Sequence, residues 1–194
     1  MSPRGVAIPD LRERLFDAAE RIVAREGAAA LTSRAVTTEA GCAKGVLHTH
    51  FGGVDVFVAE LVLDRFARAA AAAQGLPGRA GLDTVAANLN GVALGLLDSL
   101  DPRVVGLAMT SNTTSQRIRD ALAQGAPSFA AIQEALAAYL DAELRLGRLA
   151  EGTDTATTAL ALVGTVHHLL MTGWAGTPDP REQAERLVAL LVAR

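Results

Sequence analysis

The sequence is poor in several residue types, and each shortage excludes a class of protein. Cys42 is the only cysteine among 194 residues, so no disulfide can form within the chain. Aromatic residues make up only 4% of the chain, whereas alanine occurs 39 times, and this composition favours helices and excludes an all-β sandwich. Lys44 is the only lysine, and the formal net charge is −3. Without an excess of cations, any surface that binds nucleic acid must be local.

No segment is predicted to cross a membrane or to direct secretion. The first nine residues lack the apolar core of a signal peptide. The stretch 155–174 contains no Asp, Glu, Lys or Arg and has the length of a membrane span. It also contains five threonines and two adjacent histidines, and it has no basic flank, so burial in protein explains it better. We therefore expect a cytoplasmic protein.

Apolar residues recur at helical spacing along most of the chain, and no alternating run is long enough to indicate a strand. Glycine, proline and short polar clusters separate the helical segments, and the strongest break is Gly-Leu-Pro-Gly at 75–78. The segments expected before this break are 11–26, 34–39, a third that ends near residue 50, and 54–74. Those expected after it are 82–99, 101–110, 115–123, 127–147, 154–174 and 180–193. The predicted fold class is all-α, with an N-terminal three-helix head and a C-terminal bundle of about six helices.

Residues 31–51, LTSRAVTTEAGCAKGVLHTHF, have the layout of a helix-turn-helix unit. Such a unit needs two short helices, a small buried residue before a tight turn, and polar groups after it. Ala40 and Gly41 supply the small residue and the turn. The polar side chains expected to project from the third segment are Lys44, His48, Thr49 and His50.

This segment resembles the TetR family of transcriptional regulators. The resemblance runs from LRERLFDAAERIVAREG through the motif to FVAEL, and the order of helices agrees. It implies a homodimer with two DNA-binding heads, in which a small molecule bound to the helical C-terminal region changes the spacing of the heads. It implies a DNA-binding domain at 1–53 and a ligand-binding and dimerisation domain at 54–194, with the helix at 54–75 as connector. The family's DNA contacts, transferred to this chain, fall on Ser33, Arg34, Lys44, Gly45, Val46, His48, Thr49 and His50.

Four positions depart from the family's usual pattern, and each departure removes or weakens a phosphate contact. The chain has Ala43 where a serine is usual, Val46 for a threonine, His48 for a tyrosine and Val54 for a lysine. Residues 1–54 carry seven Arg and Lys against six Asp and Glu. We therefore expect weak binding to the DNA backbone and a shallow dependence on salt. The histidines of the third segment would partly compensate when protonated, because both ring nitrogens then donate.

Three residues of the head allow two interpretations each. Lys44 is either a phosphate contact or a solvated surface charge, and its place in the motif favours contact. Arg34 either contacts DNA or pairs within its helix with Thr38 or Glu39, and the sequence does not decide between them. Cys42 lies in the turn, where the family has a small apolar residue, so a buried structural thiol is expected rather than a nucleophile.

The histidines are not expected to bind a metal ion. His48 and His50 are two residues apart, so on a helix they point about 200° away from each other. His167 and His168 are about 100° apart and cannot bind one ion together, although one of them can line a pocket or a subunit interface instead of the interior. No Gly-rich phosphate loop, metal cluster or catalytic triad can be assembled from the sequence. We therefore expect no enzyme, no metal and no cofactor.

Two helices near the C-terminus have more apolar surface than the rest of one small subunit can bury. The segment 155–174 is apolar nearly all round, and the helix at 180–193 is also rich in leucine and valine. A second copy of the chain is the simplest cover, and it would form a four-helix interface. The predicted interface residues are Leu160, Val163, Gly164, His167, Met171, Leu187, Leu190 and Leu191.

A ligand pocket is expected inside the C-terminal bundle, where a few aromatic and neutral polar residues interrupt aliphatic helices. Its lining would be mainly aliphatic with little charge, which suits a hydrophobic or weakly polar effector. The candidate lining residues are Phe66, Asn88, Val92, Met109, Asn112, Phe129, Tyr139, His168 and Trp174.

The helix-turn-helix layout and the resemblance together predict a ligand-responsive DNA-binding transcriptional regulator that acts on a palindromic operator. By the habit of the family it would be a repressor, and the aliphatic character of the expected pocket suggests release by a small hydrophobic effector. The four departures keep an alternative open, a helical ligand-binding or interaction protein with a degenerate head that binds DNA weakly. Salt-sensitive binding to one DNA sequence would distinguish the two.

Overall fold

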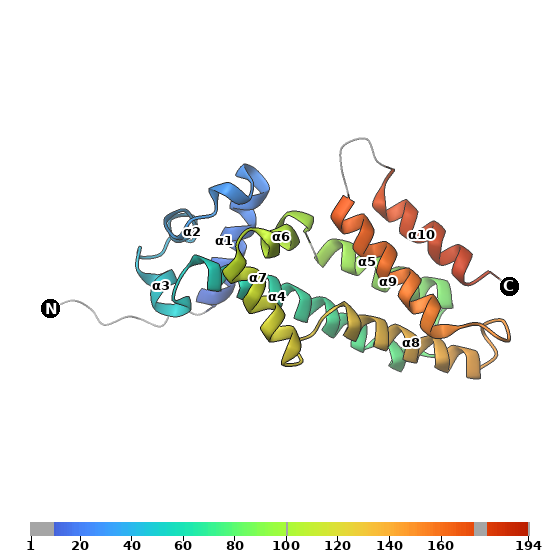
Figure 1. Cartoon of the computed structure of the whole chain (residues 1–194). Coiled ribbons are helices and arrows are strands. Elements are labelled where there is room, and N and C mark those ends of the chain that lie inside the picture. Colours follow the sequence, from blue (N-terminus) through green and yellow to red (C-terminus); the bar gives the residue numbers. More distant parts are fainter. Residues whose placement is uncertain (1–9, 100, 173–177, 194) are drawn as a thin grey trace.

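The computed structural model describes residues 10–99, 101–172 and 178–193, and within these ranges the chain forms helices and no strand. Figure 1 shows an elongated molecule with the N-terminal helices at one end and the last two helices toward the other. The first four helices are α1 (Leu11–Glu26), α2 (Ser33–Glu39), α3 (Val46–Phe51) and α4 (Val54–Gln74). The other six are α5 (Val85–Ser99), α6 (Pro102–Gly106), α7 (Asn112–Ala123), α8 (Phe129–Arg145), α9 (Thr155–Thr172) and α10 (Pro180–Leu191). The predicted all-α fold is confirmed.

Three predicted helix boundaries were wrong, two of them because polar side chains cap the helices elsewhere. Helix α7 begins at Asn112 instead of residue 115, because the Ser111 hydroxyl accepts a hydrogen bond from the Thr114 N–H at 3.0 Å. Helix α5 begins at Val85 instead of residue 82, after Thr84, whose hydroxyl accepts from the Ala87 N–H at 3.0 Å. The segment predicted as one helix at 101–110 is α6 followed by a separate 3-10 turn, Leu107–Met109.

The head has its own apolar core around three phenylalanines. The rings of Phe16, Phe51 and Phe57 lie 5.0–6.1 Å apart in tilted and edge-to-face arrangements. Leu47 of α3 and Leu61 of α4 are fully buried beside them. The first half of α4 is therefore part of the same core as α1 and α3, and the short helices are held by tertiary packing rather than by their own length.

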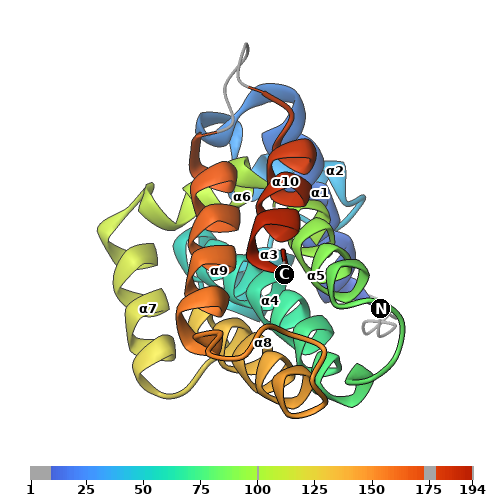
Figure 2. The same cartoon turned by 90° about the vertical axis from the view of Figure 1, so that its right-hand side faces the viewer.

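The second half of α4 belongs to a different core. Ala69 and Ala73, together with Leu76 just after the helix, are buried among residues of α5, α8 and α9, and Figure 2 shows α4 between α5, α7 and α8. The small side chains of α4 permit close approach of the neighbouring helices. One helix thus supplies apolar residues to both cores.

Helix α9 is the apolar segment that has the length of a membrane span. It packs against α8, α5 and α10. None of the helices in the described part of the chain is long and apolar enough to cross a membrane.

Candidate functional site

The turn between α2 and α3 is built as the sequence predicts. The Thr32 hydroxyl caps α2 by accepting from the Ala35 N–H at 3.1 Å. Gly41 follows α2 with φ +65°, a conformation that strongly favours glycine, and the Cys42 N–H then donates to the Thr37 carbonyl at 2.8 Å. This turn sets α3 at an angle to α2, which is the arrangement of a helix-turn-helix unit.

The residues assigned to DNA contact lie together at the end of the molecule that α2 and α3 form (Figure 1). Leu47 and Phe51 anchor α3 in the head core, so the opposite face of the helix points to solvent. The Thr49 hydroxyl donates to the Gly45 carbonyl at 3.0 Å, which leaves its oxygen able to accept. Six of the assigned residues are exposed and two are half-buried; the exposed ones are Arg34, Lys44, Gly45, His48, Thr49 and His50, and the others are Ser33 and Val46.

Three arginines of α1 form hydrogen bonds to groups at the end of α2. Arg21 and Arg25 donate to the two carboxylate oxygens of Glu39 at 2.9 and 3.1 Å. These hydrogen bonds, that from Arg21 foremost, lower the pKa of Glu39. Arg14 donates to the Ala40 carbonyl at 2.7 Å. Glu39 is thus bound by α1, which removes it as the expected partner of the exposed Arg34 and favours the DNA-contact interpretation of that residue.

Cys42 is half-buried in the turn, and its thiol donates to the Ala40 carbonyl at 3.5 Å. This position agrees with a structural thiol. The described residues contain no cluster of three or more His, Cys, Asp or Glu able to hold a metal ion.

A buried arginine joins the head to the connector helix. The Arg65 side chain is only 9% exposed, and it donates to Glu13, Asp17 and Glu20 of α1 and to Asp64 of its own helix. Glu20 takes two of these bonds, at 2.7 and 3.0 Å. The hydrogen bond to Glu20 raises the pKa of Arg65 further above its usual value.

Sequence reasoning missed this Arg65 cluster, although a signal was present. The acidic residues of α1 recur at spacings of four and three, which places them on one helical face, and Arg65 lies among apolar residues of α4. The cluster fixes α1 against α4, so a movement of α4 carries the head with it.

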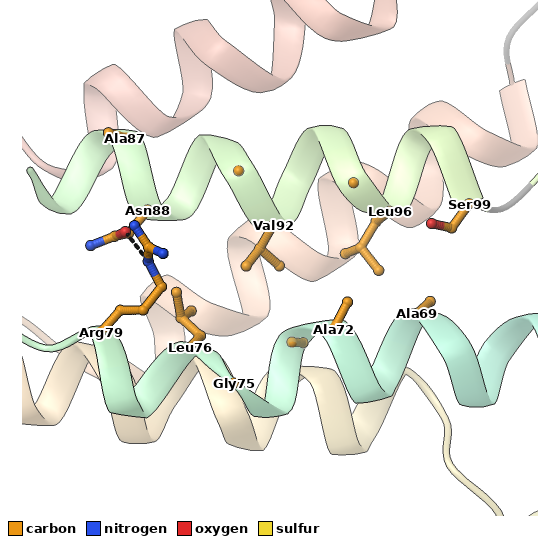
Figure 3. A pocket seen from close by; sticks show the side chains of 13 residues that line it. Ala69, Ala72, Gly75, Leu76, Arg79, Ala87, Asn88, Val92, Leu96 and Ser99 are labelled. Carbon is orange, nitrogen blue, oxygen red and sulfur yellow. Dashed lines mark hydrogen bonds between the residues drawn. The ribbon is translucent and has the colours of Figure 1, made fainter. Parts of the chain in front are cut away.

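A cleft of about 580 Å³ runs between α4 and α5 (Figure 3). Alanines of α4 line one side, together with Leu76 of the 3-10 turn Leu76–Arg79 that follows α4. The other side consists of residues of α5, among them Gly91, Val92, Gly95 and Leu96. Arg79 stands at one end, where its Nε donates to the Asn88 amide oxygen at 2.8 Å. Two of the predicted pocket residues, Asn88 and Val92, lie here.

The remaining predicted pocket residues are dispersed. Phe66 packs edge-to-face on Phe129, and Phe129 on the predicted interface residue His167, with ring centroids 5.1 and 5.0 Å apart. Tyr139 is fully buried, where burial foremost raises its pKa to about 12. The others lie on the surface or outside the described residues: Met109, Asn112 and His168 are exposed, and Trp174 lies outside the described ranges. The structure does not bring these residues together around one cavity.

Helix α9 and α10 carry an exposed apolar face. Leu160 is 55%, Met171 43% and Leu190 75% exposed. Of the other predicted interface residues, Gly164 and His167 are exposed, Leu187 and Leu191 are half-buried, and Val163 is buried in the core of its own chain. Most of the predicted interface residues therefore lie on a surface that a second molecule can reach.

Comparison with known proteins agrees with this architecture. The model of the family described as bacterial regulatory proteins, tetR family, matches residues 15–61. No curated protein matches the chain in sequence.

Solved structures share the fold at low sequence identity. A Mesorhizobium loti protein assigned to the TetR family of transcriptional regulators has a TM-score of 0.70 and 16% identity, over 97% of this chain and 96% of its own. FadR of Bacillus halodurans, a fatty acid degradation regulator, has a TM-score of 0.67 and 15% identity, over 97% of each chain. FadR of Bacillus subtilis, solved in complex with stearoyl-CoA, has a TM-score of 0.66 and 16% identity, over 93% of this chain and 97% of its own.

The family match and the solved structures agree with the division of the chain into a head and a helical body. The family match spans α1 to the first part of α4, which are the elements of the helix-turn-helix head, and the solved regulators share the helical body that follows. The helix-turn-helix head is therefore similar to that of bacterial regulatory proteins of the tetR family, and the chain shares the fold of solved TetR-family regulators.

Proposed function

We propose that the protein is a homodimeric repressor in the cytoplasm that leaves a palindromic operator when a small hydrophobic effector binds, and that it has no catalytic step of its own. Residues 1–53 would form the DNA-binding domain and 54–194 the effector and dimerisation domain, with the helix at 54–75 as connector. In this proposal the DNA contacts are the eight residues at the start of α2 and along the α3 segment.

The observation that carries this proposal is that α4 belongs both to the core of the head and to the wall of the cleft. Phe57 and Leu61 pack in the head core, whereas Ala69 and Ala73 line the cleft. The helix has 21 residues and is about 30 Å long. Because a packed helix moves as a rigid element, a ligand that shifts its cleft end displaces the head at the other end.

Homodimerisation would supply the second head. The outward face of α9 between Leu160 and Met171 carries no Asp, Glu, Lys or Arg, and it continues onto Leu190 of α10. An exposed apolar face on two neighbouring helices is typical of an interface that closes with twofold symmetry. Two heads can then bind half-sites about 34 to 36 Å apart on one face of the DNA.

The effector would act by shifting a population. A ligand that binds more tightly to the dimer with the wrong head spacing reduces the fraction able to bind DNA. The solved Bacillus subtilis FadR with stearoyl-CoA provides a precedent for small-molecule binding on this fold. We expect the corresponding ligand here to occupy the cleft beside α4.

Fluorescence anisotropy with the DNA upstream of the protein's own coding region tests the proposal. Wild-type protein should bind one palindromic sequence, with an affinity that falls as salt increases. Lys44→Ala should weaken binding about tenfold through the loss of a phosphate contact. Arg145→Ala, at the exposed end of α8, is the matched control and should bind like the wild type. Equal affinity of the Lys44→Ala and Arg145→Ala proteins would contradict the assigned role of Lys44.

One observation favours a second candidate, a ligand-binding protein whose head binds DNA too weakly to regulate. Arg14, Arg21 and Arg25 are held by Ala40 and Glu39, which leaves few cations on the surface of α2 and α3. The same titration separates the candidates. Sequence-specific binding that survives moderate salt removes the second candidate, and its absence from a folded dimer removes the first.

A further inference from the structure

The cleft between α4 and α5 has walls that suit an unbranched aliphatic chain. Its α5 wall exposes Gly91 and Gly95, and its α4 wall exposes small residues such as Ala72. A Cβ added at either glycine would meet nothing within 4 Å, so the space in front of the helix is open. Its described lining contains no aromatic ring, and therefore no surface on which a planar ligand could stack.

The dimensions of the cleft define the length of such a chain. Its lining on α5 extends from Ala87 to Ser99 (Figure 3). Twelve residues of helix span about 18 Å, and an extended hydrocarbon advances about 1.25 Å per carbon. A chain of about 12 to 14 carbons therefore fills the cleft from end to end.

One end of the cleft presents a guanidinium group. Asn88 is only 4% exposed, and its side-chain amide nitrogen donates to the Leu82 carbonyl and to the Tyr139 hydroxyl at 2.8 and 3.0 Å. This fixes its amide oxygen as the acceptor for Arg79 Nε. The position of the guanidinium at the end of the cleft is therefore set by buried groups.

Arg79 has donors left for a ligand. Besides Asn88 it pairs with Asp83, and both partners of that pair are more than half exposed, so water already weakens the interaction. A guanidinium has five N–H donors. The bonds of Arg79 to described residues use Nε and Nη2, so both N–H groups of Nη1 and the second N–H of Nη2 can donate to a carboxylate.

The other end of the cleft does not suit an anion. Ser99 borders a second cavity, which Arg65 and Arg68 line together with Glu13 and Glu20. Both arginines are already bonded to carboxylates of α1 and α4. A second anionic group would meet these carboxylates instead of a cation without a partner.

We propose that the cleft binds a linear aliphatic monocarboxylate of about 12 to 14 carbons. The carboxylate lies on Arg79, and the chain runs past Gly91 and Gly95 toward Ser99. This assignment rests on the proposed function, because it names the chemical class of the effector and the end of α4 on which it acts.

Calorimetric titration of the full-length protein without DNA tests the ligand class. We expect dodecanoate, below its micelle concentration, to bind with one site per chain. Dodecan-1-ol lacks the charge and dodecanedioate adds a second one, so each should bind at least about tenfold more weakly. Dodecanoyl-CoA binding more tightly than dodecanoate would overturn the assignment of a free carboxylate, and so would equal binding of the alcohol.

Two sets of variants test the position of the ligand. Gly91→Leu and Gly95→Leu place a side chain in the open cleft and favour helix, so the proteins should fold and lose at least about tenfold in affinity for dodecanoate. Ala138→Leu, on the exposed face of α8, is the matched control. Unchanged affinity in both glycine variants would exclude the cleft.

Arg79→Gln should lower the affinity for dodecanoate about tenfold without changing that for dodecan-1-ol, and Arg79→Lys should restore part of the loss. Arg145→Gln, which removes an exposed arginine of α8, should change neither affinity. Equal losses for the acid and the alcohol in Arg79→Gln would refute the contact with the carboxylate.

The two proposals fail separately. If folded wild-type protein does not bind dodecanoate, the ligand assignment is refuted even when another compound releases the DNA. If dodecanoate binds the cleft but leaves the affinity for DNA unchanged, the effector role is refuted and the ligand assignment stands.

Discussion

Replacing Arg65 by alanine should destabilise the protein more than the same change at Arg68, although both arginines share acidic partners. Arg65 is 9% exposed and bonds four carboxylates, whereas Arg68 is 55% exposed and bonds Glu13 and Asp64. A hydrogen bond to a charged group contributes about 1.5 to 3 kcal/mol when both groups are buried. The carboxylates around Arg65 are 21–49% exposed, which reduces that value through solvent screening.

We therefore expect Arg65→Ala to lower the free energy of unfolding by about 2 kcal/mol, and Arg68→Ala by less than about 1 kcal/mol. The alanine at 65 also loses the contact of the guanidinium with the ring of Phe16, at 5.6 Å from the ring centroid. Arg65→Lys keeps the charge but cannot form the paired bond to Glu20, so it should cost about 1 kcal/mol.

Urea denaturation followed by circular dichroism at 222 nm measures these differences. Added salt should reduce the smaller effect at Arg68 more than the effect at Arg65, because exposed pairs are screened more strongly. If Arg65→Ala is no more destabilising than Arg68→Ala, the burial of Arg65 does not stabilise the contact between α1 and α4, and the reasoning fails.

Three further predictions address other parts of the molecule. Because the pKa of Tyr139 is raised to about 12 and a free tyrosine titrates near 10, the contribution of Tyr139 to stability should be constant below pH 10 and fall by about 2 kcal/mol as pH rises to 12. Denaturation of Tyr139→Phe should show a smaller fall over this range, and equal falls would contradict the assignment. Leu160→Glu should convert a dimer into monomers in light scattering while Ala138→Glu does not, and a persistent dimer would move the interface elsewhere. Gly41→Ala should lower the free energy of unfolding by about 1 kcal/mol because of its φ of +65°, and an unchanged denaturation midpoint would show that the turn relaxes.

The sequence predicts the head well because its structure follows from local chemistry. The cap at Thr32 and the turn at Gly41 depend on residues within a few positions of each other, and the predicted turn at Gly41 is confirmed. The boundary errors at α5 and α7 have the same origin, since caps at Thr84 and Ser111 were overlooked as helix starts.

The cleft was harder to predict because part of it is open space in front of two glycines, which have no side chain. A search for aromatic and polar residues among aliphatic helices found Asn88 and Val92, but it cannot find the space in front of Gly91 and Gly95. The spacing of four between these glycines, both on one face of α5, was the available signal. Arg79 gave no local signal, because its role depends on the fold of α4 against α5.

The central claim is that ligand in the cleft changes the distance between two heads of a dimer. Pulsed electron spin resonance measures this distance with a spin label on Glu26→Cys, an exposed site on α1, in a Cys42→Ala background. The account predicts one distance between the labels of the DNA-bound dimer and a different one after dodecanoate is added. An identical distance with and without ligand, or the absence of any distance between labels, would contradict it.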